Sequence, residues 1–528
     1  MGAAEGSLSV LHPTNLTAPA TQGSIPNAPM TFSAPTPGLD LRTAPAAMKP
    51  SESSRFAALL AWSEQHGAQL HPALEVYHDD VTKFSLRVRP SLENGLEPGF
   101  RAVACPLSTT LSYLNALVDG PVRLASSPSG RTPGTPAFPA QFMESLPPHV
   151  IGRFFLIKEY LKGRDSFWAP YIATLPQPEH VSAWALPAFW PEEDIAYLAG
   201  TNAHVAIAEI QANVKSEFKQ ARKALKAAGF PAWQDYTQML YKWAFCIFTS
   251  RSFRPSLVLS EPAKQQMAEL LPPGCQLDDF SILQPLFDIA NHSMTARYAW
   301  DVASDPASCQ LVCHDAYQPG EQVYNNYGLK TNSELLLAYG FILPPTPALH
   351  NDYVHLRKRD QPEEDGDPST PGDFLISLRP VTDPSSLAVH PRLASHSAAA
   401  RAPAKATTAI SALPPFAHCE PALVDDLAAA LAAASGENLA LEREAAEEGL
   451  VARVKEMLAG KLWFDYHRLK AVEEGGDGGE YGDGDGDGDG EALPPPGNRN
   501  QRLAVEYRQR CKSVLHAALE ALMGEGER

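Results

Sequence analysis

Apolar residues follow a strand-like spacing in two parts of the chain, separated by a long stretch with helical spacing. Residues 84–112 alternate short apolar runs with turn residues such as Gly95 and Gly99, which predicts β-hairpins. From 141 to 248 apolar residues recur at steps of three and four, which predicts helices. Further strands are predicted at residues 280–287, 299–302, 310–314 and 322–324.

The C-terminal part of the chain is predicted to be helical, behind a loop-rich stretch that follows Leu349. The predicted helices cover 421–434, 441–470 and 499–523. Strands, a helical insertion, strands again and a helical tail together indicate an α+β fold. We expect a disordered N-terminal tail at 1–54 and a first domain at 55–345, with its helical insertion at about 141–248. A loop-rich linker at 346–420 should follow. The last domain, at 421–528, should be helical and contain a disordered acidic loop at 473–497.

The composition fits a mainly globular protein whose acidic charge is concentrated in two segments. The chain has 528 residues, 44% of them hydrophobic, and a formal net charge of −18. Residues 361–373 and 471–498 hold fourteen acidic residues and no Lys or Arg, which leaves about −4 for the rest. No basic face is available for phosphate backbones, so we expect no nucleic-acid partner.

The sequence contains no run of about 18 apolar residues, so no membrane span is predicted. The first 54 residues are rich in Ala, Pro, Ser and Thr but include only Arg42 and Lys49 as basic residues, whereas transit peptides are Arg-rich. We therefore expect a cytoplasmic protein, with chloroplast or nucleus as alternatives. The seven cysteines form neither a disulfide framework nor a zinc-type spacing.

An alternating Asp and Gly tract begins at Asp483 and starts like an EF-hand calcium loop. The twelfth position of such a loop must be a bidentate Glu, but here it is Pro494. We predict a solvated flexible loop and no metal site.

Three polar and aromatic clusters within Phe287–Phe341 indicate a functional site. They contain Asp288, Asn291 and His292, then Tyr324 and Tyr327, then Tyr339. Taken alone, the first cluster could be turn residues at a strand end, and the tyrosines could pack on a core. A metal-dependent hydrolase would need several more His or Asp ligands at suitable spacings, which the sequence does not offer.

The order of these clusters resembles the SET-domain protein methyltransferases, specifically the branch typified by the Rubisco large-subunit lysine methyltransferase. The resemblance covers roughly residues 55–350 closely and 415–525 loosely, and its central motifs are highly specific. The matching motifs are Ser250-Arg251-Ser252-Phe253, D-x-x-N-H-S at 288–293, G-E-Q-V at 320–323, Tyr327-Gly328, Lys330-x-Asn332-x-Glu334-Leu-Leu and Tyr339-Gly-Phe.

This resemblance implies a SET-domain β-fold of short sheets with a helical insertion, followed by an all-α substrate-binding domain. It implies S-adenosyl-L-methionine as the cofactor and Tyr327 as the catalytic residue. The cofactor-binding residues implied are Asn291, His292, Tyr327, Ser85 and Leu86. The substrate-binding residues implied are Arg251, Phe253, Asp288, Tyr298 and Tyr339.

One motif departs from the pattern of the branch. A G-x-G-L hairpin usually cradles the methionine end of the cofactor through backbone groups, and Lys83-Phe84-Ser85-Leu86 stands here in its place. Glycine lets a backbone approach a ligand closely, so cofactor binding at this hairpin depends on whether Ser85 permits the same approach.

The reaction implied is the transfer of a methyl group from a sulfonium to an amine. A lysine amine has a pKa of about 10.4, and its charged form cannot attack. A narrow aromatic channel lowers that pKa by desolvation, and Tyr327 would orient the amine. We expect a protein-lysine N-methyltransferase that acts as a monomer on a non-histone protein, bound through the SET groove and the helical C-terminal domain. A non-catalytic SET-like binding scaffold and a protein-histidine methyltransferase remain as alternatives.

Overall fold

The computed structural model describes residues 49–79, 83–124, 135–180, 184–357, 373–387, 389–390, 410–435, 443–474 and 493–524. The chain divides into two compact units. The sheet unit comprises Pro19–Ala183 and Val214–Gly328, and the helical unit comprises Met1–Ala18, Trp184–Asn213 and Leu329–Arg528. The division falls within the long helix α7 (Asn202–Ala227). The Asp and Gly tract lies outside the described residues, as does almost all of the predicted N-terminal tail.

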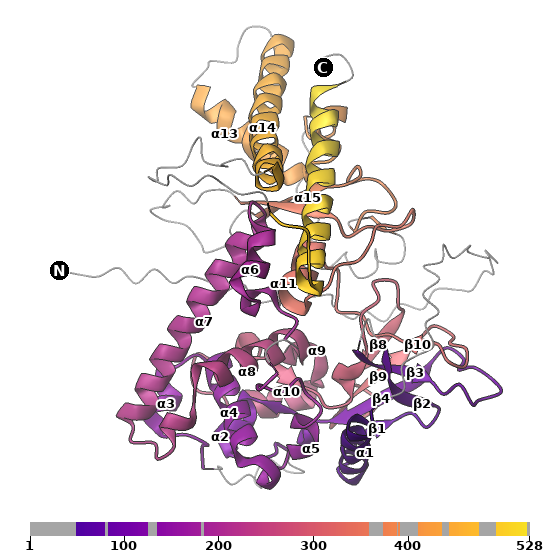
Figure 1. Ribbon diagram of the computed structural model, residues 1–528, viewed down its shortest axis with the longest axis vertical. Helices are drawn as coiled ribbons and strands as arrows, with labels where there is room; N and C mark the ends of the chain where they lie inside the picture. The colour runs from indigo at the N-terminus through magenta and orange to yellow at the C-terminus, as the bar shows by residue number, and fades with distance from the viewer. Residues whose placement is uncertain are drawn as a thin grey trace. The chain divides into compact units, whose positions relative to one another are not determined.

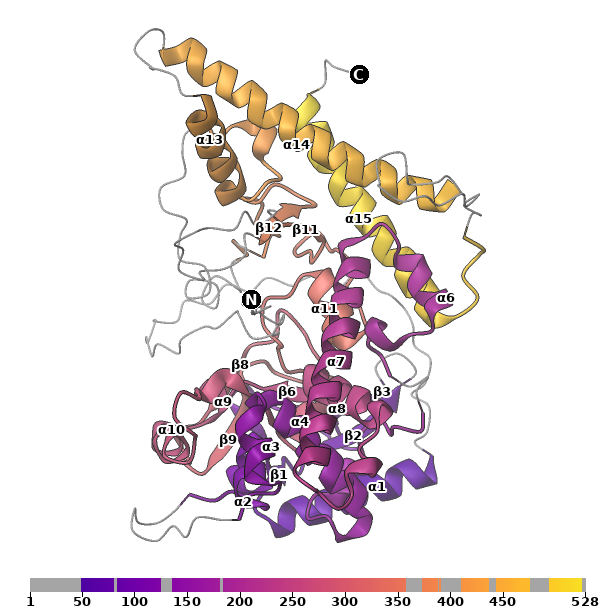
Figure 2. The ribbon, with the colours of Figure 1, turned by 90° about the vertical axis from the view of Figure 1, so that its left-hand side faces the viewer.

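The sheet unit contains three small antiparallel sheets, and Figures 1 and 2 label their strands except β5 and β7. Their strand orders are β1-β4-β9-β8, β10-β3-β2 and β5-β7-β6. The strands are β1 (Gln69–Leu70), β2 (Leu74–Asp79), β3 (Lys83–Val88), β4 (Phe100–Pro106), β5 (Leu111–Ser112), β6 (Ser252–Phe253), β7 (Ile282–Leu283), β8 (Tyr298–Asp301), β9 (Ser308–Cys313) and β10 (Gln322–Val323). The strands predicted at 299–302, 310–314 and 322–324 are therefore confirmed as β8, β9 and β10.

The pairing of the N-terminal strands differs from the prediction. Residues 84–112 were expected to form hairpins with one another, but β3 pairs with β2 and β10 whereas β4 pairs with β1 and β9. The prediction was wrong because each strand is largely buried between two partners, one of which, β10 or β9, comes from a distant part of the sequence. The predicted strand 280–287 is also shorter, since only Ile282 and Leu283 pair before the chain turns.

Helices pack beside the sheets of this unit, and α4 contacts both α2 and α8. The helix α4 is buried on most of its circumference because residues 150–157 include six large apolar side chains. The helices of the unit are α1 (Pro50–Gln65), α2 (Tyr113–Val118), α3 (Ala140–Ser145), α4 (Pro148–Lys162), α5 (Ala169–Ile172), α8 (Gln238–Arg251), α9 (Pro255–Val258) and α10 (Glu261–Ala268), together with the second half of α7.

The helical unit is built around α14 and α15, which pack against each other (Figure 2). Its elements are α6 (Glu192–Ile195), the first half of α7, α11 (Asn332–Tyr339), β11 (Tyr353–Arg357), β12 (Asp373–Ser377), α13 (Pro421–Ser435), α14 (Arg443–Glu474) and α15 (Arg499–Met523). The three predicted C-terminal helices are confirmed. Strands β11 and β12 form an antiparallel pair within the stretch that the sequence favoured as loop.

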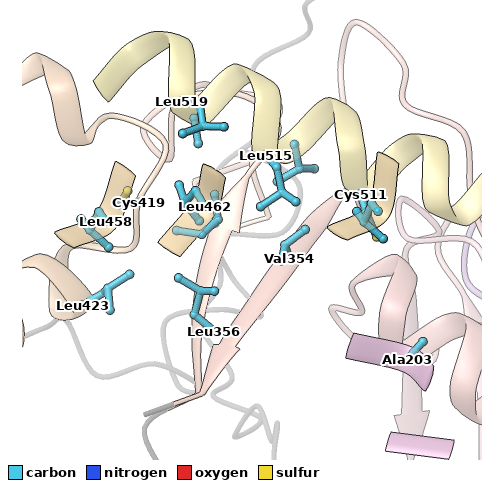
Figure 3. Close-up of a cluster of buried hydrophobic side chains, with 14 of the residues drawn as sticks. Ala203, Val354, Leu356, Cys419, Leu423, Leu458, Leu462, Cys511, Leu515 and Leu519 are labelled. Carbon is cyan, nitrogen blue, oxygen red and sulfur yellow. The ribbon is translucent and has the colours of Figure 1, made fainter. Parts of the chain in front are cut away.

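The core of the helical unit joins segments that are far apart in the sequence. Leu356 of β11, Leu458 and Leu462 of α14 and Leu515 of α15 lie in one buried cluster, which Figure 3 shows. A polar clasp, the hydrogen bonds that the buried Asp194 carboxylate accepts from Asn498, Asn500 and Gln501 at the start of α15, lies beside this apolar cluster. This clasp fixes α6 to the N-terminus of α15.

Helix α11 begins and ends at residues of the Lys330–Phe341 motifs. Glu334 and Thr331 form a capping box, in which the Glu334 carboxylate accepts from the Thr331 main-chain N–H at 2.7 Å. The helix ends at Gly340, whose φ of +74° and whose closeness to the Ala185 carbonyl leave no room for a Cβ atom. These motif residues therefore have a structural role in the helical unit.

No helix among the described residues is long and apolar enough to cross a membrane. Within the same residues, no group of three or more His, Cys, Asp or Glu side chains is arranged to hold a metal ion. The seven cysteines are free thiols, and all except Cys275 are buried.

Candidate active site

The site begins with a turn that leads out of β7. Leu286 is buried and has a φ of +70°, a left-handed conformation that is costly for a residue with a branched side chain. The turn leads into a short 3-10 helix at Phe287–Ile289 and places Asp288 in a buried position. Strained backbone of this kind is concentrated at functional sites in proteins.

The segment after this turn lies beside residues 325–327. The Asn325 N–H donates to the Asn291 carbonyl at 2.8 Å, and the Ser293 N–H donates to the Asn325 carbonyl at 2.9 Å. Side chains add to the pairing, since Asn326 Nδ2 donates to the Met294 carbonyl and Trp300 Nε1 donates to Asn325 Oδ1. These bonds fix the first polar cluster of the sequence against the second.

Tyr327 is held at both ends by the first cluster. Its main-chain N–H donates to His292 Nδ1 at 3.0 Å, and its phenol donates to the Ala290 carbonyl at 3.0 Å. The His292 and Tyr327 rings stack with their centroids 5.0 Å apart. Burial raises the pKa of the Tyr327 phenol to about 12, so the phenol is protonated at neutral pH.

Arg251 and Asp288 form an ion pair beside this tyrosine. Arg251, the last residue of α8, donates from Nη1 to the Asp288 carbonyl at 3.2 Å and to Asp288 Oδ2 at 3.3 Å. The charges of both residues act on the Tyr327 phenol. Tyr171 of α5 also donates to Asp288 Oδ2, at 3.0 Å, a contact that no sequence motif indicated.

An aromatic cluster lies next to the ion pair. Phe253, Phe287 and Trp300 contact one another edge to face, with centroids 5.2 to 6.3 Å apart. Tyr298 packs on Trp300 at 5.5 Å, and burial raises the pKa of its phenol to about 12. The substrate-binding residues predicted from the sequence included Phe253 and Tyr298 but not Trp300, which lies between them in this cluster.

The hairpin of β2 and β3 also reaches this region, since β3 contacts the 3-10 helix that contains Asp288. Lys83 stands where the resemblance places the first glycine, and its φ is +64°, a conformation that favours glycine. Ser85 stands at the second glycine position, is fully buried, and its Oγ has no hydrogen-bond partner among the described residues. Leu86 is also fully buried and pairs with Val323 of β10.

A polar chain connects this hairpin to Asn291. Asn291 Nδ2 donates to Gln322 Oε1 at 3.3 Å, and Gln322 Nε2 donates to the Tyr77 hydroxyl. Tyr77 is the cross-strand partner of Ser85, so both side chains belong to the same face of the hairpin. The hairpin position of Tyr77 and Ser85 is thus connected through Gln322 to Asn291, one of the residues predicted to bind the cofactor.

The sheet unit therefore contains nine of the ten residues that were expected at the site. They are Ser85, Leu86, Arg251, Phe253, Asp288, Asn291, His292, Tyr298 and Tyr327. Tyr339 is the last residue of α11 and belongs to the helical unit, where its ring contacts Phe341 at 6.2 Å. Its place in a lysine channel stays a prediction.

Short antiparallel sheets and two adjacent polar segments, one of which ends in Tyr-Gly, define a SET-domain fold, and solved structures support this classification. A structure of Rubisco LSMT bound to sinefungin and monomethyllysine matches with a TM-score of 0.53 and 17% identity, over 90% of this chain and 92% of that one. A structure of Rubisco LSMT bound to AdoMet matches with a TM-score of 0.53 and 16% identity over the same shares. The expected SET-domain fold is confirmed.

Curated proteins similar in sequence are protein methyltransferases. The ribosomal lysine N-methyltransferase set10 of Schizosaccharomyces pombe is 30% identical over 308 residues, which is 56% of this chain and 49% of that protein. The N-lysine methyltransferase SETD6 of Rattus norvegicus is 25% identical over 340 residues, 62% of this chain and 64% of that protein. The actin-histidine N-methyltransferase of Rhinolophus ferrumequinum is 27% identical over 184 residues, 34% of this chain and 27% of that protein.

The resemblance to the SET-domain methyltransferase branch of the Rubisco enzyme is thus confirmed in both sequence and fold. The chain spans about half to two thirds of the length of the first two relatives. No protein-family model matches the chain.

Proposed function

We propose that this protein is an S-adenosylmethionine-dependent protein-lysine N-methyltransferase that acts on a non-histone protein. The observation that supports this most strongly is the fixation of Tyr327 by His292 and Ala290, beside the Arg251 and Asp288 ion pair. The comparisons also support this proposal. The similar solved structures are described with lysine or AdoMet bound, and two of the similar curated proteins are lysine methyltransferases.

The cofactor would supply a methyl group that is already activated on a sulfonium sulfur. Ser85 offers a buried hydroxyl that has no partner in the described part of the chain, and Lys83 gives the hairpin a glycine-like backbone. Asn291 and His292 lie on the segment that is paired with residue 325. These residues fit a polar ligand, and we assign them to the cofactor.

Tyr327 acts in this proposal as an orienting group rather than as a base. With a pKa of about 12 the phenol stays protonated at neutral pH, and its O–H donates a hydrogen bond to the Ala290 carbonyl. A phenol oxygen that donates in this way can still accept a hydrogen bond from an amine. Orientation of a reacting amine contributes to rate because the reacting atoms are held close to the geometry of attack.

The aromatic cluster would enclose the methylene stem of a lysine and exclude water. Phe253, Trp300 and Tyr298 provide apolar and aromatic surface beside Asp288. Loss of water disfavours the charged ammonium and lowers the pKa of the amine, which increases the fraction able to attack. We also assign Tyr339 to this channel, as its motif suggests.

Protein-histidine methylation is the second candidate, and the similarity to an actin-histidine N-methyltransferase over 184 residues favours it. A target imidazole needs a polar partner for its second ring nitrogen. Asp288 and Asn291 are the side chains of the site that could provide one.

We further propose that the protein works as a cytoplasmic monomer without a nucleic-acid partner and binds its substrate partly through the helical unit. The low residual charge outside the two acidic segments supports the absence of nucleic-acid binding. Exposed Met457, Trp463 and Phe464 on α14 support a protein-binding role of the helical unit.

Transfer of a radiolabelled methyl group from S-adenosylmethionine to proteins of a cell lysate tests the proposed function. We expect labelling of at least one protein, with the label on lysine when the modified peptide is analysed by mass spectrometry. Label on histidine would favour the second candidate. No labelled protein with the wild-type chain would contradict both and favour a non-catalytic scaffold.

A further inference from the structure

The phenol of Tyr171 reaches the site from a part of the chain 117 residues before Asp288. It lies on α5, a helix of four residues, and is almost fully buried. The neighbouring chain is fixed on both sides, because Trp168 Nε1 donates to the Thr109 carbonyl at 3.0 Å and Arg55 donates to the Ala173 carbonyl at 3.1 Å. The position of the phenol is therefore set by the packing of α5.

The Asp288 carboxylate is bonded unequally. Oδ2 accepts from Tyr171 at 3.0 Å and from Arg251 at 3.3 Å, whereas Oδ1 is buried and has no hydrogen-bond partner within the described residues. A buried charged oxygen without a donor is costly, so the charge of this carboxylate depends on the two donors at Oδ2.

We propose, on the basis of the proposed function, that Tyr171 is a positioning residue for methyl transfer. Its hydrogen bond keeps the Asp288 carboxylate ionised and oriented, so that Arg251 stays paired beside Tyr327. Tyr171 acts through Asp288 and does not itself touch the reacting groups.

The charged and titratable groups around Asp288 agree with this role. Arg251 faces it from the end of α8, Tyr171 from α5 and Tyr327 from the segment after β10, and the Asp288 charge also acts on Cys105 of β4. Burial raises the pKa of Asp288, while the charge of Arg251 and the hydrogen bonds of Tyr171 and Arg251 lower it. Without the phenol, one of the hydrogen bonds that counter the effect of burial is lost, so the pKa of Asp288 rises further.

The test is the pH profile of kcat/KM for Tyr171→Phe, because this profile reports ionisations of the free enzyme. The methyl acceptor is the first protein that lysate labelling identifies, used in purified form. Asp288 should become protonated at a higher pH in the variant, so the acid limb should move up by about one pH unit. At neutral pH we expect a loss of about tenfold in kcat/KM, which should shrink as the pH is raised. Titration of the substrate amine is common to both proteins and cancels in the comparison.

Tyr241→Phe is the matched control. Tyr241 is also a fully buried phenol that donates to a carboxylate shared with an arginine, in this case Glu217 and Arg153. It belongs to α8 but not to the site, so its removal should affect stability without moving the acid limb. A Tyr171→Phe profile that is unchanged, or that is lowered by the same factor at every pH, would overturn the positioning role while leaving the proposed function intact. Absence of methyl transfer by the wild-type protein would overturn both.

A second probe keeps the proposal testable if Tyr171→Phe does not fold. Incorporation of 2,3-difluorotyrosine at position 171 retains the ring and the hydroxyl but makes the phenol a stronger donor. The pKa of Asp288 should then fall, and the acid limb should move to lower pH. An acid limb that stays in place, or moves to higher pH, would contradict the proposal.

Discussion

The main-chain N–H of Tyr327 donates to His292 Nδ1, and the two rings stack at 5.0 Å. Because Nδ1 accepts this bond, the neutral imidazole has its proton on Nε2. The phenol of the same tyrosine donates to the Ala290 carbonyl. Tyr327 is thus fixed by two residues of one segment, His292 at its backbone and ring and Ala290 at its hydroxyl, as expected for a group that must orient another.

Tyr327→Phe should therefore reduce catalysis strongly and stability little. The ring can still stack on His292, but the hydroxyl that would orient the amine is lost. We expect kcat to fall about 100-fold, the effect typical of a misplaced reacting group. Rates of methyl transfer measure this effect, and calorimetry with S-adenosylmethionine should show an affinity within about threefold of the wild type.

Tyr236→Phe, a change to a buried phenol in the sheet unit, is the control and should leave kcat unaltered. Equal activity of Tyr327→Phe and the wild type would exclude the catalytic role.

A substitution in the β2–β3 hairpin should improve stability and cofactor binding rather than reduce them. Lys83 has the positive φ of a glycine, which costs a residue with a Cβ about 1 to 2 kcal/mol. Lys83→Gly should therefore stabilise the protein by about 1 kcal/mol and, because it relieves the backbone and keeps the Ser85 hydroxyl, should bind S-adenosylmethionine more tightly. Thermal unfolding and calorimetry measure the two effects.

Lys83→Ala is the control for Lys83→Gly, because it removes the long side chain but keeps the Cβ atom. It should show neither the gain in stability nor the gain in affinity. If Lys83→Ala and Lys83→Gly behave alike, the strained backbone is not the cause.

The candidate site could be predicted as far as its residues are consecutive or occur in motifs. His292 and Tyr327 are 35 residues apart, yet both belong to short polar segments within predicted strands and turns, and the structure places their rings in contact. Tyr171 and Trp300 were missed because an isolated tyrosine or tryptophan in an apolar run is indistinguishable from a core residue. Their roles depend on which buried group each contacts.

The pairing of strands could not be predicted for a related reason. Strand β4 is a short, largely buried run flanked by turns, so the local pattern is the same whether it pairs with β3 or with β9. Pairing is decided by contacts between distant segments, and the backbone bridge between Leu96 and Tyr317 is one example. Helices α13, α14 and α15 were predicted well because a helix satisfies its own backbone and depends less on such contacts.

A buried ion network in the sheet unit predicts how stability depends on pH. The Glu217 carboxylate accepts from Arg153 at 2.7 Å, from Tyr241 at 2.8 Å and pairs with His149 at 3.0 Å. Burial acts against the charged form, but these partners outweigh it and lower the pKa of Glu217 to about 2. An unfolded glutamate has a pKa of about 4.3, so the ionised group stabilises the fold above that pH.

Glu217→Gln should therefore cost about 2 to 3 kcal/mol of unfolding free energy at pH 7. The difference from the wild type should shrink as the pH falls from about 5 towards the folded-state pKa of about 2, because the unfolded carboxylate takes up its proton first and the folded one last. Urea unfolding at several pH values measures this. Glu93→Gln, at an exposed position, should show no such trend. A difference that stays constant down to pH 2 would mean that the charge of Glu217 does not contribute.

The outer face of α14 has an apolar surface that folding does not explain. Met457 is 50% exposed, Trp463 53% and Phe464 39%, and Trp463 stacks on His467 at 3.9 Å. Gly460 lies on the same face in the helix interior, where it costs about 1 kcal/mol relative to alanine, and nothing lies within 4 Å of the place of a Cβ atom. A glycine between exposed aromatic residues lets a partner approach the helix closely.

If this surface binds the protein substrate, Trp463→Ala should raise KM for the substrate protein about tenfold and leave kcat unchanged. A partly exposed tryptophan at a protein interface is often worth more than 1 kcal/mol of binding, but its removal from an exposed position costs little stability. A short peptide around the target lysine should be methylated equally by the variant and the wild type, because it lacks the folded protein surface that α14 would bind. Met523→Ala on α15, where the side chain is 40% exposed, should leave KM for the protein unchanged. A rise in KM for peptide and protein alike would place the effect of Trp463 in the site rather than on a substrate-binding surface.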